Sequence, residues 1–231
     1  MLRTNATYFG DKFSILICVP DRGQEEASDV EFRLVYHGDL FAENEGRNQN
    51  SQWRENRAKH KHKIRKEFHR QLRELWSIHP GLKSYGAVRH YSTGDKSQLE
   101  IIASNFEENG FRFVPLATRQ NCLLCKVEIL MLRPGTPGSV IVNPGDLDNR
   151  LKTLFDALKK LNGKDELGGY SPDDGETPFF CLLEDDGIIT HAAVETDTLL
   201  NPTTKNISEV LAIISVTVRP YGGPMASMVF L

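Results

Sequence analysis

The chain has 231 residues, of which 26% are charged and 39% are hydrophobic, as in an ordinary globular protein. Its formal net charge is −3, so the chain as a whole lacks the positive charge expected of a surface that binds polyanions everywhere. No apolar run is long enough to form a membrane-spanning helix, and no signal-peptide pattern opens the sequence. We therefore expect a cytoplasmic protein with no membrane partner.

The N-terminal part is predicted to contain strands and a loop. Residues 13–19 and 30–36 combine β-branched and aromatic residues with turn signals nearby, which indicates two strands. Residues 38–50 are polar and contain glycine, so they are predicted to form a loop that could act as a mobile arm.

Residues 51–78 are predicted to form one long basic helix, because no proline or glycine appears before Pro80. The segment holds nine lysines and arginines against three glutamates. Such a cluster can supply the sequence-independent part of nucleic-acid affinity, although a solvated helix face explains it about as well. The candidate DNA-binding residues are Arg54, Arg57, Lys59, Lys61, Lys63, Arg65 and Lys66. An intermittent inward face could come from Trp53, Ile64, Phe68, Leu72, Leu75 and Trp76.

The middle of the chain is predicted to be mainly β-structure. Residues 82–97 are interpreted as an irregular connection, and residues 99–103, 111–116 and 122–132 as strands.

Two patterns that could suggest metal or redox chemistry are interpreted as structural. Cys122 and Cys125 form a C-x-x-C, but in a strand the two thiols would lie on opposite faces, and no second pair exists for zinc. His60 and His62 would point to different sides of a helix. We expect neither pattern to bind metal.

Residues 146–158 are predicted to form an amphipathic helix. Its apolar stripe starts at Leu147 and continues to Leu161, and Asn162-Gly163 would end the helix. Asp148, Lys152 and Asp156 share a polar face, and Asp146 suits the helix start. Acids at a helix start often serve only as caps, so this motif alone is weak support for catalysis.

A second acidic motif follows a predicted inserted loop. Its turn residues indicate a loop over residues 164–178, or over about 163–178 if the preceding glycine is included. Asp173-Asp174 in the loop copies the motif superficially, without a strand beside it. The motif itself, Asp185-Asp186, follows an apolar segment at residues 179–183. Further strands are predicted at residues 188–194 and 209–218. The whole pattern predicts one α+β domain over residues 1–231, with a mixed sheet and two main helices.

Aspartates converging with a lysine suit hard divalent cations, so Mg²⁺ is the expected cofactor and Mn²⁺ a possible substitute. An EF-hand is excluded, because a loop counted from Asp146 lacks the central glycine and ends at Ala157 rather than at a glutamate. The acids and the basic helix together favour a phosphodiester substrate, for which bound metals would lower the pKa of an attacking water.

The two motifs resemble those of RusA-type Holliday junction resolvases. The resemblance rests on Asp146-Leu-Asp148-Asn149 with Lys152 and Asp156-Ala-Leu, followed by Asp185-Asp186, and spans about residues 141–195. It implies a RusA-like fold and a homodimeric, metal-dependent endonuclease that nicks four-way DNA junctions in recombination and repair. It also implies catalytic roles for Asp146, Asp148, Lys152 and Asp186, and metal binding by Asp146, Asp148, Asp185 and Asp186.

Two other hypotheses remain open. The family often has a lysine in the strand after its Asp-Asp, where this chain has Val194-Glu195-Thr196. That departure favours a non-catalytic nucleic-acid-binding protein that retains the fold. The acids would also suit metal-dependent hydrolysis of small phosphorylated substrates.

Overall fold

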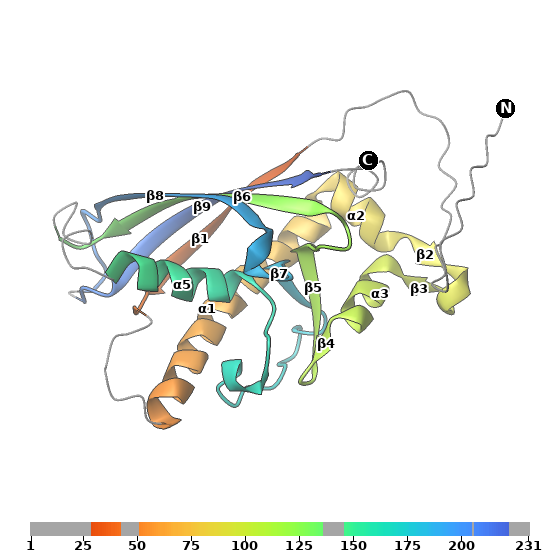
Figure 1. Cartoon of the computed structure of the whole chain (residues 1–231), viewed down its shortest axis with the longest axis horizontal. Coiled ribbons are helices and arrows are strands. Elements are labelled where there is room, and N and C mark those ends of the chain that lie inside the picture. The colour runs from red at the N-terminus through yellow and green to blue at the C-terminus, as the bar shows by residue number, and fades with distance from the viewer. Residues whose placement is uncertain (1–28, 43–50, 136–145, 205, 222–231) are drawn as a thin grey trace.

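The computed structural model of the protein describes residues 29–42, 51–135, 146–204 and 206–221 (Figure 1). The helices are α1 (Ser51–Ile78), α2 (Pro80–Ala87), α3 (Gln98–Asn105) and α5 (Asp146–Leu158), with short 3₁₀ turns η1 (Tyr91–Thr93), η2 (Lys164–Glu166) and η3 (Asp186–Ile188). The strands are β1 (Val30–Asp39), β2 (Arg89–His90), β3 (Lys96–Ser97), β4 (Glu107–Glu108), β5 (Phe111–Ala117), β6 (Leu123–Arg133), β7 (Phe179–Leu183), β8 (Ile189–Thr198) and β9 (Glu209–Pro220).

The strands build one large sheet and two smaller ones. The large sheet has the order β1-β9-β6-β8, in which β8 is parallel to β6 and the other pairs are antiparallel. A three-stranded sheet has the order β4-β5-β7, and its β5 and β7 are parallel. In Figure 1, α5 lies beneath the large sheet and beside α1. The predicted α+β class with a mixed sheet is confirmed.

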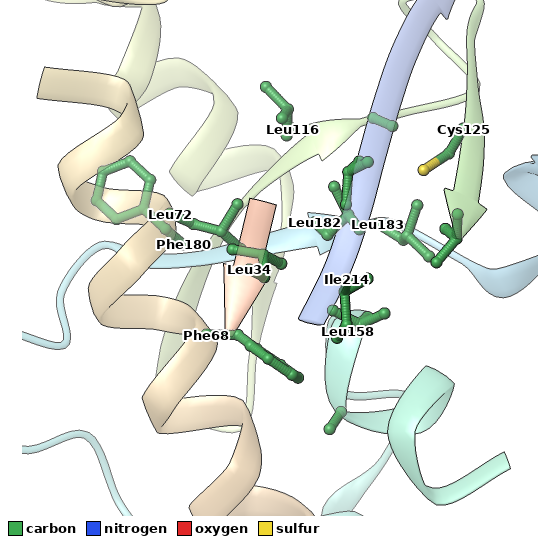
Figure 2. Packing of buried hydrophobic residues seen from close by; sticks show 14 of the residues in the cluster. Leu34, Phe68, Leu72, Leu116, Cys125, Leu158, Phe180, Leu182, Leu183 and Ile214 are labelled. Carbon is green, nitrogen blue, oxygen red and sulfur yellow. The ribbon is translucent and has the colours of Figure 1, made fainter. Parts of the chain in front are cut away.

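The main core fills the space between the large sheet, α1, α5 and β7. Alternate residues of β9 face this core, and all five that the sequence assigned to one face are buried, namely Val210, Ala212, Ile214, Val216 and Val218. Figure 2 shows Ile214 near Leu158 of α5, with Phe68 and Leu72 of α1 on the other side of Leu34. A second core cluster contains Phe111, Phe113 and Phe179.

Most of the predicted elements that the structure describes are confirmed, namely both long helices and the strands β1, β5, β6, β7, β8 and β9. Residues 13–19 and most of the predicted arm at 38–50 lie outside the described residues. Cys125 is buried in β6 as expected, whereas Cys122 precedes the strand with a φ of 51°.

Two predictions for residues 82–103 were wrong, because local capping favours helices there. Pro80 stands at the start of α2, where the His79 ring accepts a hydrogen bond from the Leu82 amide. Ser97 and Glu100 form a capping box that starts α3 where a strand had been predicted. The described residues therefore contain four helices, and α2 and α3 pack against each other through Gly86 and Leu99.

Three histidines of α1 are structural. The His62 ring is fully buried against Phe111, Tyr170 and Phe179, and the His69 Nδ1 atom accepts a hydrogen bond from the Phe180 amide at 2.8 Å. His60 packs on Phe41. Burial lowers the pKa of His60 to about 4 and that of His62 to about 3. These rings are thus neutral at physiological pH.

We predict that the free energy of unfolding decreases between about pH 7 and about pH 5. The folded state keeps His60 and His62 neutral, whereas histidines of the unfolded chain take up protons below about pH 6.5, so acid favours unfolding. At about pH 5 each ring costs up to about 2 kcal/mol. Urea unfolding at several pH values measures this loss. His62→Phe should reduce it, and Tyr91→Phe on the exposed surface should not.

Candidate functional site

The first acidic motif occupies the N-terminal half of α5. This half is anchored to the segment after β1, because Arg150 donates a hydrogen bond to the Leu40 carbonyl and the Thr153 hydroxyl donates one to the Phe41 carbonyl. Asp148 and Lys152 lie one turn apart on the opposite, exposed side of the helix. The side chain of Asp146 lies outside the described residues. The anchoring therefore leaves Asp148 and Lys152 accessible to solvent.

The second acidic motif lies where the parallel strands β5 and β7 end at one sheet edge. The Glu184 carboxylate accepts a hydrogen bond from the Arg119 amide at 2.9 Å, and Asp185 Oδ1 lies 3.0 Å from Arg119 Nη2. Asp185 Oδ1 also accepts a hydrogen bond from the Gly187 amide at 2.8 Å. The Gly187 amide and then the Arg119 guanidinium hold the pKa of Asp185 below its ordinary value. Asp185 is thus a charged, hydrogen-bonded carboxylate.

A chain of alternating charges connects Asp186 to the interior. Lys159 Nζ lies 3.3 Å from Asp186 Oδ2 and 3.1 Å from Asp156 Oδ1, and Asp156 Oδ2 lies 3.0 Å from Lys61 Nζ. The Asp186 side chain is 52% exposed, whereas the Lys159 and Asp156 side chains are only 11% and 12% exposed. Burial alone would raise the pKa of Asp156, but Lys61 and Lys159 outweigh it and keep this pKa low. Lys159 is therefore the lysine beside the second motif.

The two acidic motifs lie at opposite ends of α5. Figure 1 shows the C-terminal end of α5 beside β7, and an isolated bridge joins Lys159 to Leu183 at this end. Asp148 precedes Asp156 by eight residues, which corresponds to about 12 Å along a helix axis. The expected meeting of Asp148 and Lys152 with Asp185 and Asp186 is therefore not realised. In the part of the chain that the structure describes, no three His, Cys, Asp or Glu side chains are grouped to hold a metal.

The two motifs differ in how well they would accept a metal ion. At the second motif a cation would compete with Arg119 and Lys159 for the oxygens of Asp185 and Asp186. At the first motif the Asp148 carboxylate is exposed near a helix N-terminus. The described side chains thus offer Mg²⁺ or Mn²⁺ a single exposed carboxylate at the first motif, and carboxylates already held by cations at the second.

Two of the candidate DNA-binding residues lie in the interior, which corrects their predicted role. Arg65 is 1% exposed and donates hydrogen bonds from Nη2 to the Asp156 carbonyl at 2.8 Å and from Nε to the Lys159 carbonyl at 3.2 Å. Arg57 is buried and donates to the Ala42 carbonyl. Because both guanidinium groups bind main-chain oxygens beneath the surface, neither is placed to contact a phosphate.

The inserted loop covers one side of α1 and neutralises part of its charge. Lys66 Nζ lies 2.6 Å from Asp173 Oδ2 and 3.0 Å from Glu176 Oε1. Gly168, with a φ of +59°, approaches the backbone of Lys59 so closely that an added Cβ would lie 2.7 Å from its nitrogen. Asp173, which the sequence suggested was a decoy, thus holds the loop on the helix.

The other basic residues of α1 are divided between pairing and exposure. Lys61 is paired with Asp156, and Lys59 with Glu55 on the same helix. Arg54 and Lys63 are exposed. The candidate surface for phosphate contacts on α1 is therefore much smaller than its composition suggested.

Comparisons with family models, curated proteins and solved structures find nothing that matches this chain. Among the helices within the described ranges, none is both long and apolar enough to cross a membrane.

We predict that Arg65→Met lowers the free energy of unfolding by about 3–5 kcal/mol, because it removes the donors for buried carbonyls of α5 and a cation near Asp156. Lys63→Met on the exposed face of the same helix is the matched control, with an expected change within about 0.5 kcal/mol. Urea unfolding compares the two. Equal effects would show that Arg65 has no special structural role.

We predict that Lys159→Met raises the pKa of Asp156. The substitution removes one of the two neighbouring cations, whereas burial continues to penalise the charged carboxylate. Carbon-detected NMR titration of the Asp156 carboxyl measures the change. Lys160→Met provides the control, since Lys160 pairs with Glu108 instead. An unchanged Asp156 titration in Lys159→Met would contradict the charge chain.

Proposed function

We propose that the protein is a metal-dependent endodeoxyribonuclease of the RusA type that cleaves branched DNA such as Holliday junctions. The observation that carries this proposal is the exposed pair of Asp148, in the D-L-D-N motif, and Lys152, one turn further along α5. The exposed carboxylate of Asp186 after β7 belongs to the second motif. The proposal includes a homodimer and roles for Asp146 and Asp185 as further acids.

The side chains of the first motif suit phosphoryl chemistry. When bound, a divalent cation would supply an activated water and charge stabilisation for the displacement. Asp148 would hold that cation, and Lys152 would lie one turn along the helix to contact a phosphate oxygen. Both are exposed, so an extended DNA backbone would not have to enter a deep pocket to reach them.

The exposed basic side chains suggest how DNA would be held. Arg54 and Lys63 project from α1, which packs along α5. Arg119 is 65% exposed at the second motif. These cations would supply the salt-dependent part of DNA affinity.

A second candidate function is DNA binding without cleavage. The observation that favours it is the separation of the two acidic motifs by the length of α5, together with the commitment of Asp185 and Asp186 to Arg119 and Lys159. This candidate retains the exposed cations and requires no metal.

We predict that the protein nicks synthetic four-way junctions in Mg²⁺ or Mn²⁺, and that Asp148→Asn and Lys152→Ala each reduce the rate by about 100-fold or more. Both substitutions remove charge from the proposed reaction centre. Asp165→Asn is the matched control, because Asp165 is an exposed acid on the inserted loop and should be dispensable.

Junction binding is measured in parallel by electrophoretic mobility shift. Binding without nicking by the wild type, under either metal, would reject the nuclease in favour of the second candidate. Cleavage that survives both substitutions would reject the first motif as the reaction centre.

A further inference from the structure

The two outer strands of the large sheet, β1 and β8, differ in whether another part of the molecule occupies their outward main-chain groups. At the β1 edge, Gln71 of α1 donates a hydrogen bond from Nε2 to the Val35 carbonyl at 2.8 Å and accepts one at Oε1 from the Val35 amide at 2.9 Å. One carboxamide thus occupies both outward main-chain groups in the middle of β1. Another strand could not pair along this edge without displacing Gln71.

The β8 edge is open along its length as far as the structure describes the chain. β8 has ten residues and pairs with β6 on one side, and no described strand pairs with its other side. His191, Ala192, Ala193 and Glu195 are exposed. A long strand edge of this kind presents unpaired amides and carbonyls that can accept a further strand.

We propose that β8 pairs antiparallel with β8 of a second copy of this chain, with Ala193 on the two-fold axis. Pairing of identical edges about a two-fold axis is isologous and closes at two copies. The two four-stranded halves would then form one continuous sheet. The inference rests on the homodimer included in the function proposed above and names its interface, but it does not depend on DNA cleavage.

The side chains of β8 favour a second copy over an unrelated strand. When Ala193 lies opposite Ala193 of the partner subunit, His191 lies opposite Glu195 of the partner subunit. The two-fold axis repeats this pair, so the interface contains it twice. Alternation places these residues on one face of the sheet, where Ala193 and Glu195 line a shallow groove with Arg33 and Glu128. An imidazole opposite a carboxylate stabilises a cross-strand pair.

Neighbouring registers match the charges of the two strands less well. Centring the pair on Ala192 would leave His191 opposite Ala193 of the partner subunit, without a carboxylate partner. Centring it on Val194 would place His191 opposite Asp197 of the partner subunit, but it would also set the two Glu195 side chains on a diagonal, where like charges oppose pairing. Only the Ala193 register gives each Glu195 a histidine and keeps the two acids apart, and the small side chain at the axis allows close approach.

The test is sedimentation velocity of the full chain from about 1 to about 100 µM, the range in which a modest interface exchanges between monomer and dimer. The wild type is expected to dimerise. His191→Glu places two acids opposite each other twice, and Ala193→Lys places two ammonium groups on the axis. Each should raise the dimer Kd by about tenfold or more.

Two further variants decide where the interface lies. His191→Glu combined with Glu195→Lys restores opposite charges and should restore dimerisation. Glu31→Lys, a charge change at an exposed residue of the blocked β1 edge, should leave the Kd unchanged. A monomeric wild type throughout the range, or dimers that ignore both β8 substitutions, would overturn the proposal. A circular-dichroism melt verifies that each variant is folded.

Discussion

The buried guanidinium of Arg65 fixes how the two long helices lie against each other. The last carbonyls of a helix have no partner within it and carry a partial negative charge. Arg65 reaches from α1 to carbonyls at the C-terminal end of α5, at Asp156 and Lys159, and satisfies them inside the protein. This contact brings Lys61 to Asp156, and it leaves Lys159 directed at Asp186. The charged chain beside the second motif is thus a consequence of one helix-end interaction.

The same arrangement explains why α1 is so basic. Its cations serve mainly to join separate parts of the fold: Arg65 binds the end of α5, Arg57 binds the Ala42 carbonyl, and Lys66 binds the inserted loop. A count of charged residues along the sequence assumes that all of these side chains lie at the surface. Counted in the structure, much of the positive charge is balanced by carbonyl dipoles and carboxylates of the same chain, and so it is not available to a polyanion.

The sequence predicted best the elements whose burial follows a simple period. The alternation of β9 and the stripe of α5 identified their inward faces, because each face is set by local geometry alone. It failed for α3, where the Ser97–Glu100 capping box outweighed a short apolar run. It also failed to separate the two acidic motifs, because residue spacing does not reveal which end of a helix meets the next strand. That depends on the bridge between Lys159 and Leu183, a long-range contact with no local signal.

The carboxamide of Gln71 has a consequence for the size of any assembly. If both outer strands of the sheet could accept a neighbour, each added copy would present a fresh edge, and the sheet could extend into a filament. With the Val35 groups occupied, the described part of the large sheet leaves only β8 as an open outer strand, and the β8 pairing proposed above would use up that strand in both copies. In that assembly, one side chain on a helix would limit growth of the large sheet to a closed pair.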